Sequence, residues 1–275
     1  MDARSSRRLT SGPSPMPTNY VPVSREHHGL RRWRRYDNYA FAREIHIIDI
    51  ALAETAKVAS AMPIVFVGPP EALEPRALMG LEPGNNSFVG SDSQWHGAYV
   101  PAFLRGHPFK FRSTGQELVL CIDEASVADE AGETFFDEAG ALSPAIQLVV
   151  SFLQQLEVSR QAARAAAAAL ARLGLVSRIP PDAVPGLAPH HAAALLGVDA
   201  QALSALSDQD FASLRATDAV QLAYHQMLSL EQWPALLAHT KRKRDHAAAL
   251  SARAAAIYRP ADDGELQIDW NRFKT

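Results

Sequence analysis

The sequence of 275 residues contains a single cysteine, Cys121. One thiol can form neither an internal disulfide nor a thiolate zinc cage, so no covalent or metal crosslink of that kind is expected to stabilise the chain. This composition favours a reducing compartment. Cys121 lies in the apolar run 118–122 and is interpreted as a packing residue.

Long apolar runs are also missing. A membrane-spanning helix needs roughly 20 predominantly apolar residues, and the best candidate, 139–156, is interrupted by Ser143, Pro144, Ser151, Gln154 and Gln155. The arginines near the N-terminus are followed by Ser, Gly and Pro instead of an apolar signal-peptide core. We therefore expect a soluble, cytoplasmic protein without membrane insertion, whose translation starts at Met1 or Met16.

A strong excess of one charge is absent as well, because the net charge is −3 at pH 7. Nucleic acid is therefore not favoured as a partner, and an anionic partner would need a local patch. The strongest basic cluster consists of Arg31, Arg32, Trp33, Arg34 and Arg35. Its interleaved aromatic ring suits stacking on such a partner, whereas the alternative is that the long side chains cover the edge of a core.

Motifs that would identify a reaction are not found. The chain has no phosphate-binding glycine motif and no G-x-S-x-G elbow. Its ten histidines show no spacing typical of metal ligands, and the acidic segment 123–138 matches no EF-hand loop, so it is interpreted as a solvated loop. No metal site is predicted, and the catalytic residues and cofactors are unknown.

The apolar pattern indicates the fold. Short runs rich in β-branched residues alternate with turn residues between 45 and 123, which favours antiparallel pairing. Ser143 and Pro144 then form a helix start, an Ala-rich stretch follows, and Gly174 is a stop. A short helix is predicted over 99–105, and the strands 110–112 and 118–122 are expected to pair across the turn 113–116. Further helices are predicted over 208–228 and 231–258. The expected class is α+β: a curved antiparallel sheet with short helical insertions, packed against an Ala-rich helical half.

Four segments follow from this pattern. Residues 1–19 are predicted to be a disordered tail, because they are polar and rich in Ser, Pro and Arg. A strand-rich region spans 20–141, and a helical region of the same or a closely packed domain spans 142–258. Residues 259–275 form a C-terminal tail of unknown role.

The middle of the chain carries a family resemblance. It rests on Met62-Pro63-Ile64-Val65-Phe66, Ala77-Leu78-Met79-Gly80-Leu81, Asn86-Ser87-Phe88-Val89, Trp95, Tyr99 to Arg105, Cys121-Ile122-Asp123-Glu124, Phe136 to Gly140 and Ser143-Pro144. In this order and spacing the segments resemble the SapC family of bacterial proteins, over about 20–237. Gly106-His107 and Thr55 depart from the family pattern. The family takes its name from a surface-layer locus. The resemblance implies neither an established activity nor a set of catalytic residues.

Seven residues in these segments are polar or amphipathic without an evident backbone role: Trp95, Tyr99, Arg105, His107, Asp123, Glu124 and Asp137. We hypothesise that they share a cleft for a peptide or a small polar ligand. His107 lies between Gly106 and Pro108, where loop residues often carry function. The alternative for Arg105 is an ion pair with one of the carboxylates.

The sequence leaves three functions open. The first is a binding or accessory protein that acts on a peptide, a small polar ligand or a protein partner, through the cleft or the basic cluster. The second is a metal-dependent enzyme, with iron as the candidate, that modifies peptides or small molecules. The third is a surface-layer-associated protein, which would require an export signal that the N-terminus lacks.

Overall fold

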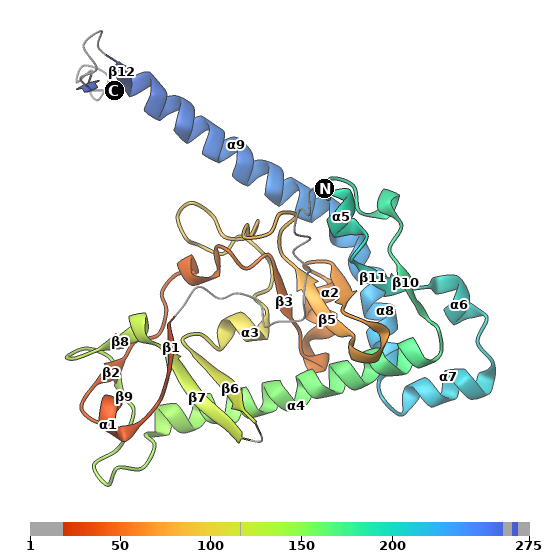
Figure 1. The fold of residues 1–275 in the computed structure, drawn as a ribbon, viewed down its shortest axis with the longest axis horizontal. Coiled ribbons are helices and arrows are strands. Elements are labelled where there is room, and N and C mark those ends of the chain that lie inside the picture. The colour runs from red at the N-terminus through yellow and green to blue at the C-terminus, as the bar shows by residue number, and fades with distance from the viewer. Residues whose placement is uncertain (1–18, 116, 261–265, 269–275) are drawn as a thin grey trace, which may run out of the picture.

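The computed structural model describes residues 19–115, 117–260 and 266–268. Antiparallel strands dominate the first half of the chain and helices dominate the second (Figure 1). This confirms the α+β class. The predicted disordered tail falls almost entirely on residues outside the described part, as does most of the predicted C-terminal tail.

The largest sheet has five strands in the order β10-β11-β4-β5-β3. Its members are β3 Ile47–Asp49, β4 Ile64–Val67, β5 Glu74–Leu78, β10 Val176–Arg178 and β11 Leu196–Val198. The sequence does not indicate β10 and β11, because three-residue strands are too short to show a period of two. The two halves of the chain therefore share one sheet.

A second sheet has the order β1-β7-β6 and carries part of the candidate site. It contains β1 Tyr20–Pro22, β6 Phe109–Thr114 and β7 Glu117–Asp123, where β6 and β7 form the hairpin expected from the sequence. A third sheet places β2 Arg32–Trp33 between β8 Val127–Ala128 and β9 Glu133–Thr134. A last pair joins β12 Tyr258–Pro260 to β13 Leu266–Ile268.

The described helices are α1 Arg25–His28, α2 Thr55–Ala59, α3 Ala102–Arg105, α4 Pro144–Arg172, α5 Pro189–Ala192, α6 Ala200–Ser204, α7 Asp208–Arg215, α8 Ala219–Ser229 and α9 Trp233–Ile257. The prediction of a single helix over 208–228 is wrong. Asp218 adopts a left-handed backbone, with φ of 53°, and divides the segment into α7 and α8. The short helix predicted at 99–105 begins only at Ala102.

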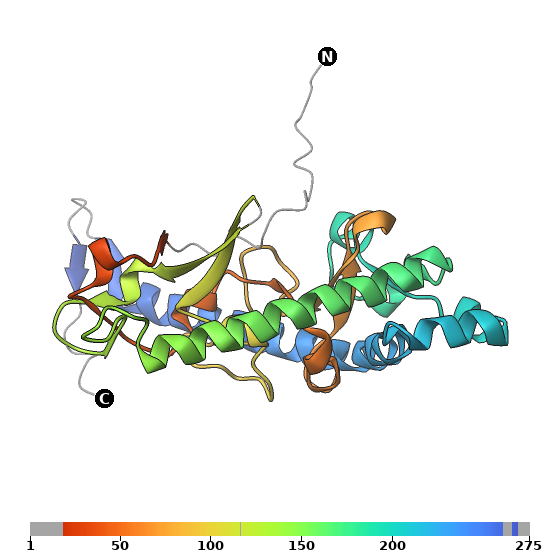
Figure 2. The ribbon, with the colours of Figure 1, turned by 90° about the horizontal axis from the view of Figure 1, so that it is seen from below.

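Helix α4 runs along the length of the molecule and joins its two main sheets (Figure 2). It begins as predicted: the Ser143 hydroxyl accepts a hydrogen bond from the Ile146 N–H at 3.3 Å, and Pro144 occupies the first helical position. Its first half packs beneath β6 and β7. Its second half presents buried alanines to α8, since small side chains let two helices approach closely.

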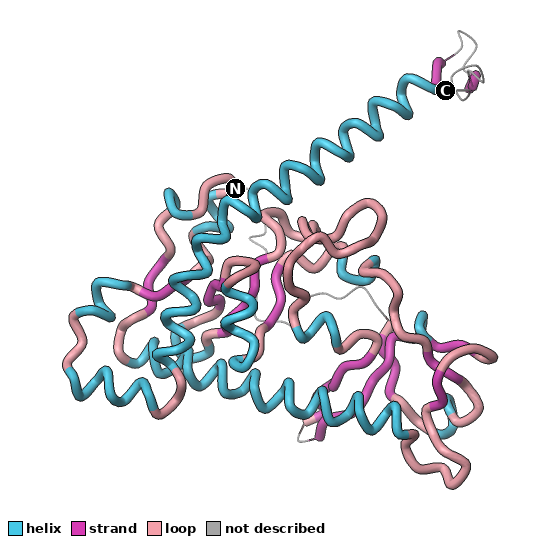
Figure 3. The backbone as a smooth tube through the Cα atoms, turned by 180° about the vertical axis from the view of Figure 1, so that it is seen from behind, coloured by secondary structure: helices cyan, strands magenta, loops and turns pink. Residues whose placement is uncertain are grey.

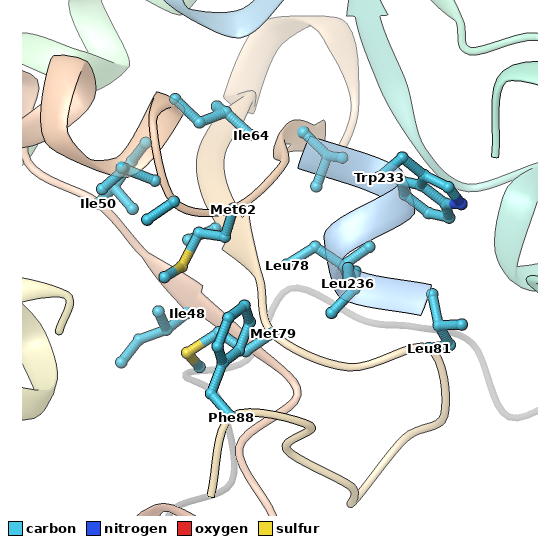
Figure 4. Packing of buried hydrophobic residues seen from close by; sticks show 14 of the residues in the cluster. Ile48, Ile50, Met62, Ile64, Leu78, Met79, Leu81, Phe88, Trp233 and Leu236 are labelled. Atoms are coloured by element: carbon cyan, nitrogen blue, oxygen red, sulfur yellow. The ribbon is translucent and has the colours of Figure 1, made fainter. Parts of the chain in front are cut away.

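The central core lies between the five-stranded sheet and the start of α9 (Figure 4). Met62, Met79 and Phe88 lie on the strand side, and Trp233 and Leu236 reach them from the helix. The Trp233 indole N–H donates to the Pro185 carbonyl at 2.9 Å, which satisfies the polar atom of this buried ring. This core fixes where α9 begins.

Beyond its first turns α9 leaves the body of the molecule and projects outward (Figures 1 and 3). Every residue from Arg244 to Arg253 is exposed. Among the helices of the described residues, none has the length and hydropathy to cross a membrane.

Candidate functional site

Arg105, the last residue of α3, is the exposed charged group of the candidate site. One of its guanidinium nitrogens donates to the Tyr99 hydroxyl at 3.0 Å, and the guanidinium carbon lies 5.6 Å from the centre of the Tyr99 ring and 5.8 Å from that of Phe152. Two aromatic faces and a hydroxyl therefore hold the cation in place. Within the described chain, Arg105 forms no ion pair with Asp123 or Asp137, so the alternative interpretation of Arg105 as their ion-pair partner is not found there.

Glu54 bonds both to Tyr99 and to the first residue of the helix that carries Arg105, and no sequence pattern indicates this role. Its carboxylate accepts hydrogen bonds from the Tyr99 hydroxyl at 2.9 Å and from the Ala102 and Ala51 N–H groups at 2.8 and 3.0 Å. Glu54 is only 5% exposed, and these three donors compensate for the lost hydration of a buried charge. Burial and the neighbouring Glu54 raise the pKa of Tyr99 to about 12, so its hydroxyl stays protonated and donates.

A group of aromatic rings adjoins Arg105. Tyr36, Tyr39 and Phe41 pack edge to face or tilted, with ring centres 5.1 to 6.0 Å apart. Trp95 extends the group, because its ring lies 5.6 Å from Tyr39 and stacks on Phe88 at 5.3 Å. Tyr36, Tyr39, Phe41 and Trp95 are all half-buried, so each ring keeps some surface in contact with solvent. We call these four residues the aromatic wall.

His107 joins the aromatic wall to a buried polar cluster. Its ring stacks on Phe41 at 3.8 Å, and its Nδ1 lies 3.3 Å from the Tyr20 hydroxyl while Nε2 lies 3.9 Å from an Asp123 carboxylate oxygen. His107 is 7% exposed and Asp123 is 5% exposed. Burial lowers the pKa of His107 to about 4 and raises the pKa of Asp123, so burial disfavours the charged form of both groups.

Five of the seven predicted cleft residues are thus linked by side-chain interactions, with His107 and Asp123 in the buried part of the group. Trp95 contacts Tyr39, Tyr36 contacts Tyr39 and His107, and the charge of Arg105 acts on Tyr36, whose pKa is raised to about 12 mainly by burial. The two tyrosines come from the segment after the basic cluster. Their link to this site could not be read from the sequence.

The remaining two predicted cleft residues lie elsewhere. Glu124 is exposed and accepts a hydrogen bond from the Asn19 side chain at 2.7 Å. Asp137 closes a loop, because its carboxylate accepts the Ala141 N–H at 2.8 Å beside Gly140, which has a φ of 77° that favours glycine. The structure gives Asp137 a local role in a turn.

Comparison with known proteins places the same segments in a family. The family model of SapC matches residues 23–236, which is most of the chain. The chain belongs to the SapC family. No curated protein and no solved structure matches it. The match confirms the resemblance read from the sequence; it contains Arg105, the aromatic wall and Glu54, and it ends in the first turns of α9.

The basic cluster of this SapC chain is largely engaged by its own acidic segment. Arg31 pairs with Asp129 at 3.0 Å, Arg35 pairs with Glu133 at 2.9 Å, and Arg32 donates to the Gly132 carbonyl at 3.0 Å. The pairing follows from β2, which lies between β8 and β9 of that segment. The acidic segment is therefore an ion-pair partner as well as a solvated loop.

The two other members of the cluster differ in exposure. Trp33 is 2% exposed and packs against Phe109, so its faces are not available for stacking on a partner. Arg34 is exposed. The free cationic surface of this cluster is therefore smaller than the sequence suggests.

The thiol of this SapC chain is not exposed for nucleophilic chemistry. Cys121 is fully buried in β7, and burial raises the pKa of its thiol. In the described part of the chain, His, Cys, Asp and Glu side chains form no group of three or more that could hold a metal ion. The exposed chemistry of the site is therefore the Arg105 cation and the aromatic wall.

Proposed function

We propose that this SapC-family protein is a binding protein whose site anchors a carboxylate of its ligand on Arg105. The observation that carries the proposal is an exposed guanidinium held by the Tyr99 hydroxyl and two rings, without an ion-pair partner among the described residues. Arginine presents several N–H donors in a planar fork that matches a carboxylate. One guanidinium nitrogen bonds to the Tyr99 hydroxyl, and the side chain as a whole is exposed.

The site is organised before a ligand arrives. Arg105 donates to Tyr99, and Tyr99 donates in turn to the buried Glu54. Because Glu54 also accepts the Ala102 N–H at the start of α3, the helix that carries Arg105 is tied to the same acceptor. A cation fixed in this way loses little side-chain entropy on binding, which favours affinity.

The aromatic wall supports a ligand that also has an apolar or aromatic part. The half-buried ring of Tyr39 contacts both Tyr36 and Trp95, and the charge of Arg105 acts on Tyr36. Rigid rings supply a large contact area at a low entropic cost. A peptide or a small amino-acid derivative combines both features.

The test compares N-acetylphenylalanine with its carboxamide, which has the same ring and no charge. We expect the acid to shift the NMR signals of the purified chain and the amide to bind at least about tenfold more weakly, as loss of a charge-assisted hydrogen bond implies. Arg105→Ala should abolish the preference for the acid. Arg178→Ala, which removes another exposed arginine, should preserve it.

Two results would contradict the proposal. Equal binding of the acid and the amide would show that no carboxylate is recognised. An unchanged preference in Arg105→Ala, with a circular dichroism spectrum like that of the wild type, would show that Arg105 is not the anchor.

A further inference from the structure

Strand β6 has an open outer edge directly after the candidate site. It is the last strand of the sheet β1-β7-β6 and pairs only with β7 in the described chain. The end of this edge is accessible, because Ser113 and Thr114 are exposed. An unpaired strand edge is a template for the backbone of another extended chain.

The register shows which backbone groups face that edge. The Asp123 N–H donates to the Pro108 carbonyl at 2.8 Å, so residues 108, 110, 112 and 114 of β6 face β7. On the other side of β7, the Val23 N–H donates to the Leu120 carbonyl at 2.9 Å, which agrees with this alternation. The N–H and C=O groups of Phe111 and Ser113 therefore point away from the sheet.

Arg105 lies at the beginning of this edge. Three residues connect it to Phe109, the first residue of β6, and the Phe109 N–H donates back to the Gly106 carbonyl at 2.8 Å. The Phe152 ring beneath the Arg105 guanidinium belongs to the same packed cluster as Phe111. The carboxylate anchor and the open edge are thus neighbours.

The direction of an added strand decides which of its ends would lie beside Arg105. The basic side chains of β6 do not decide it, because Lys110 lies over the Tyr20 ring and Arg112 donates to the Tyr20 carbonyl at 3.3 Å. Tyr20 belongs to β1 on the far side of β7, so these two side chains reach away from the open edge. A strand added antiparallel to β6 would end with its C-terminus beside Phe109, next to Arg105.

We infer that the ligand class is the C-terminal segment of a peptide or protein, which adds to β6 as an antiparallel strand and places its terminal carboxylate on Arg105. This inference rests on the proposed function of Arg105. Affinity comes from the outward backbone groups of Phe111 and Ser113. The aromatic wall receives the last side chain.

The experiment is an N-methyl scan of the acetylated pentapeptide Glu-Val-Thr-Val-Phe with a free C-terminus. Its β-branched residues favour an extended backbone, and methylation of one amide removes one donor. In strand pairing only every second peptide N–H faces the partner. We expect methylation to weaken binding about 3- to 10-fold at alternate positions and to change it little between them.

A protein variant gives the matching readout. Ser113→Pro removes an N–H that points to the open edge of β6 and leaves the hydrogen bonds to β7 in place, since an edge strand tolerates proline at such a position. Ser113→Ala keeps that N–H and is the matched control. We expect Ser113→Pro to weaken the pentapeptide and to leave N-acetylphenylalanine unchanged, while Ser113→Ala changes neither.

The outcomes separate the two proposals. If N-acetylphenylalanine binds through Arg105 but the pentapeptide binds no better and shows no alternation, strand addition is overturned and the carboxylate site stands. Equal pentapeptide binding by Ser113→Pro and Ser113→Ala would also overturn strand addition. If Arg105→Ala binds both probes like the wild type, the proposed function itself fails.

Discussion

Glu54 is the residue on which the geometry of Arg105 depends. It accepts the Tyr99 hydroxyl and two backbone N–H groups in a buried position. A buried donor that loses its acceptor lowers the stability of the fold by the free energy of its lost hydration, so Glu54 matters for folding. The exposed Arg105 matters for binding more than for folding. Support and recognition are thus carried by different residues.

Glu54→Ala is therefore expected to lower the free energy of unfolding by about 3 kcal/mol, because two buried backbone N–H groups and the half-buried Tyr99 hydroxyl lose their acceptor. Urea unfolding followed by circular dichroism measures this. Glu71→Ala, at an exposed position, is the control and should change stability little. A Glu54→Ala protein as stable as this control would show that the three hydrogen bonds are replaced by water.

His107 is the second residue whose effect can be measured separately, because it changes how stability depends on pH. Its pKa is lowered to about 4 by burial, so between about pH 6.5 and 4 the unfolded chain binds a proton that the folded chain does not. The folded state therefore loses stability as the pH falls through this window. The raised pKa of Asp123 acts in the opposite direction below that carboxyl's own folded pKa, since protonation there favours the folded form.

We expect His107→Gln to remove up to about 2 kcal/mol of the loss in unfolding free energy between pH 7 and pH 4.5. The measurement is urea unfolding at both pH values. Other histidines with lowered pKa values, such as His28 and His46, contribute with the same sign and stay in the variant. His246→Gln, at an exposed position, is the control. Equal pH dependence in wild type and His107→Gln would contradict this assignment.

At the scale of elements, α4 decides how the sheets are held together. Its first half packs under β6 and β7, and its alanines pack against α8. The start of α4 was predictable, because Ser143 and Pro144 act on their own backbone. The partners of its two halves were not, since an Ala-rich helix does not show in sequence which alanines are buried.

Two adjacent alanines test this packing. Ala166 is fully buried and Ala165 is exposed. Ala166→Leu should lower the free energy of unfolding by about 2 kcal/mol, because the added methyl groups overfill the interface. Ala165→Leu should change it little, since alanine and leucine have similar helix propensities. Thermal or urea unfolding measures both, and equal stabilities would mean that the interface can expand.

The whole molecule brings together segments that are distant in sequence. β10 and β11 join the sheet of β3, β4 and β5, and the basic cluster at Arg31 to Arg35 pairs with the acidic segment about Asp129 to Glu133. The antiparallel strands and the α+β class followed from alternation and turn residues. The strand of Trp33 did not, because two residues carry no pattern.

The candidate site shows the same division. Tyr99, Arg105, His107 and Asp123 could be selected from the sequence as polar residues without a backbone role, and the family match contains them. Glu54 could not, because nothing local distinguishes it from a surface glutamate. Asp137 was selected for the same reason as Asp123, yet it closes a turn.

The sequence by itself determined the α+β class, the β6–β7 hairpin, the start of α4 and membership of the SapC family, since each depends on neighbouring residues or on order along the chain. Only the tertiary structure decided that Arg105 is unpaired among the described residues, that Glu54 supports it and that the basic cluster is engaged. Charges and hydrogen bonds act between atoms a few ångströms apart, and sequence spacing does not encode which distant groups folding brings within that range.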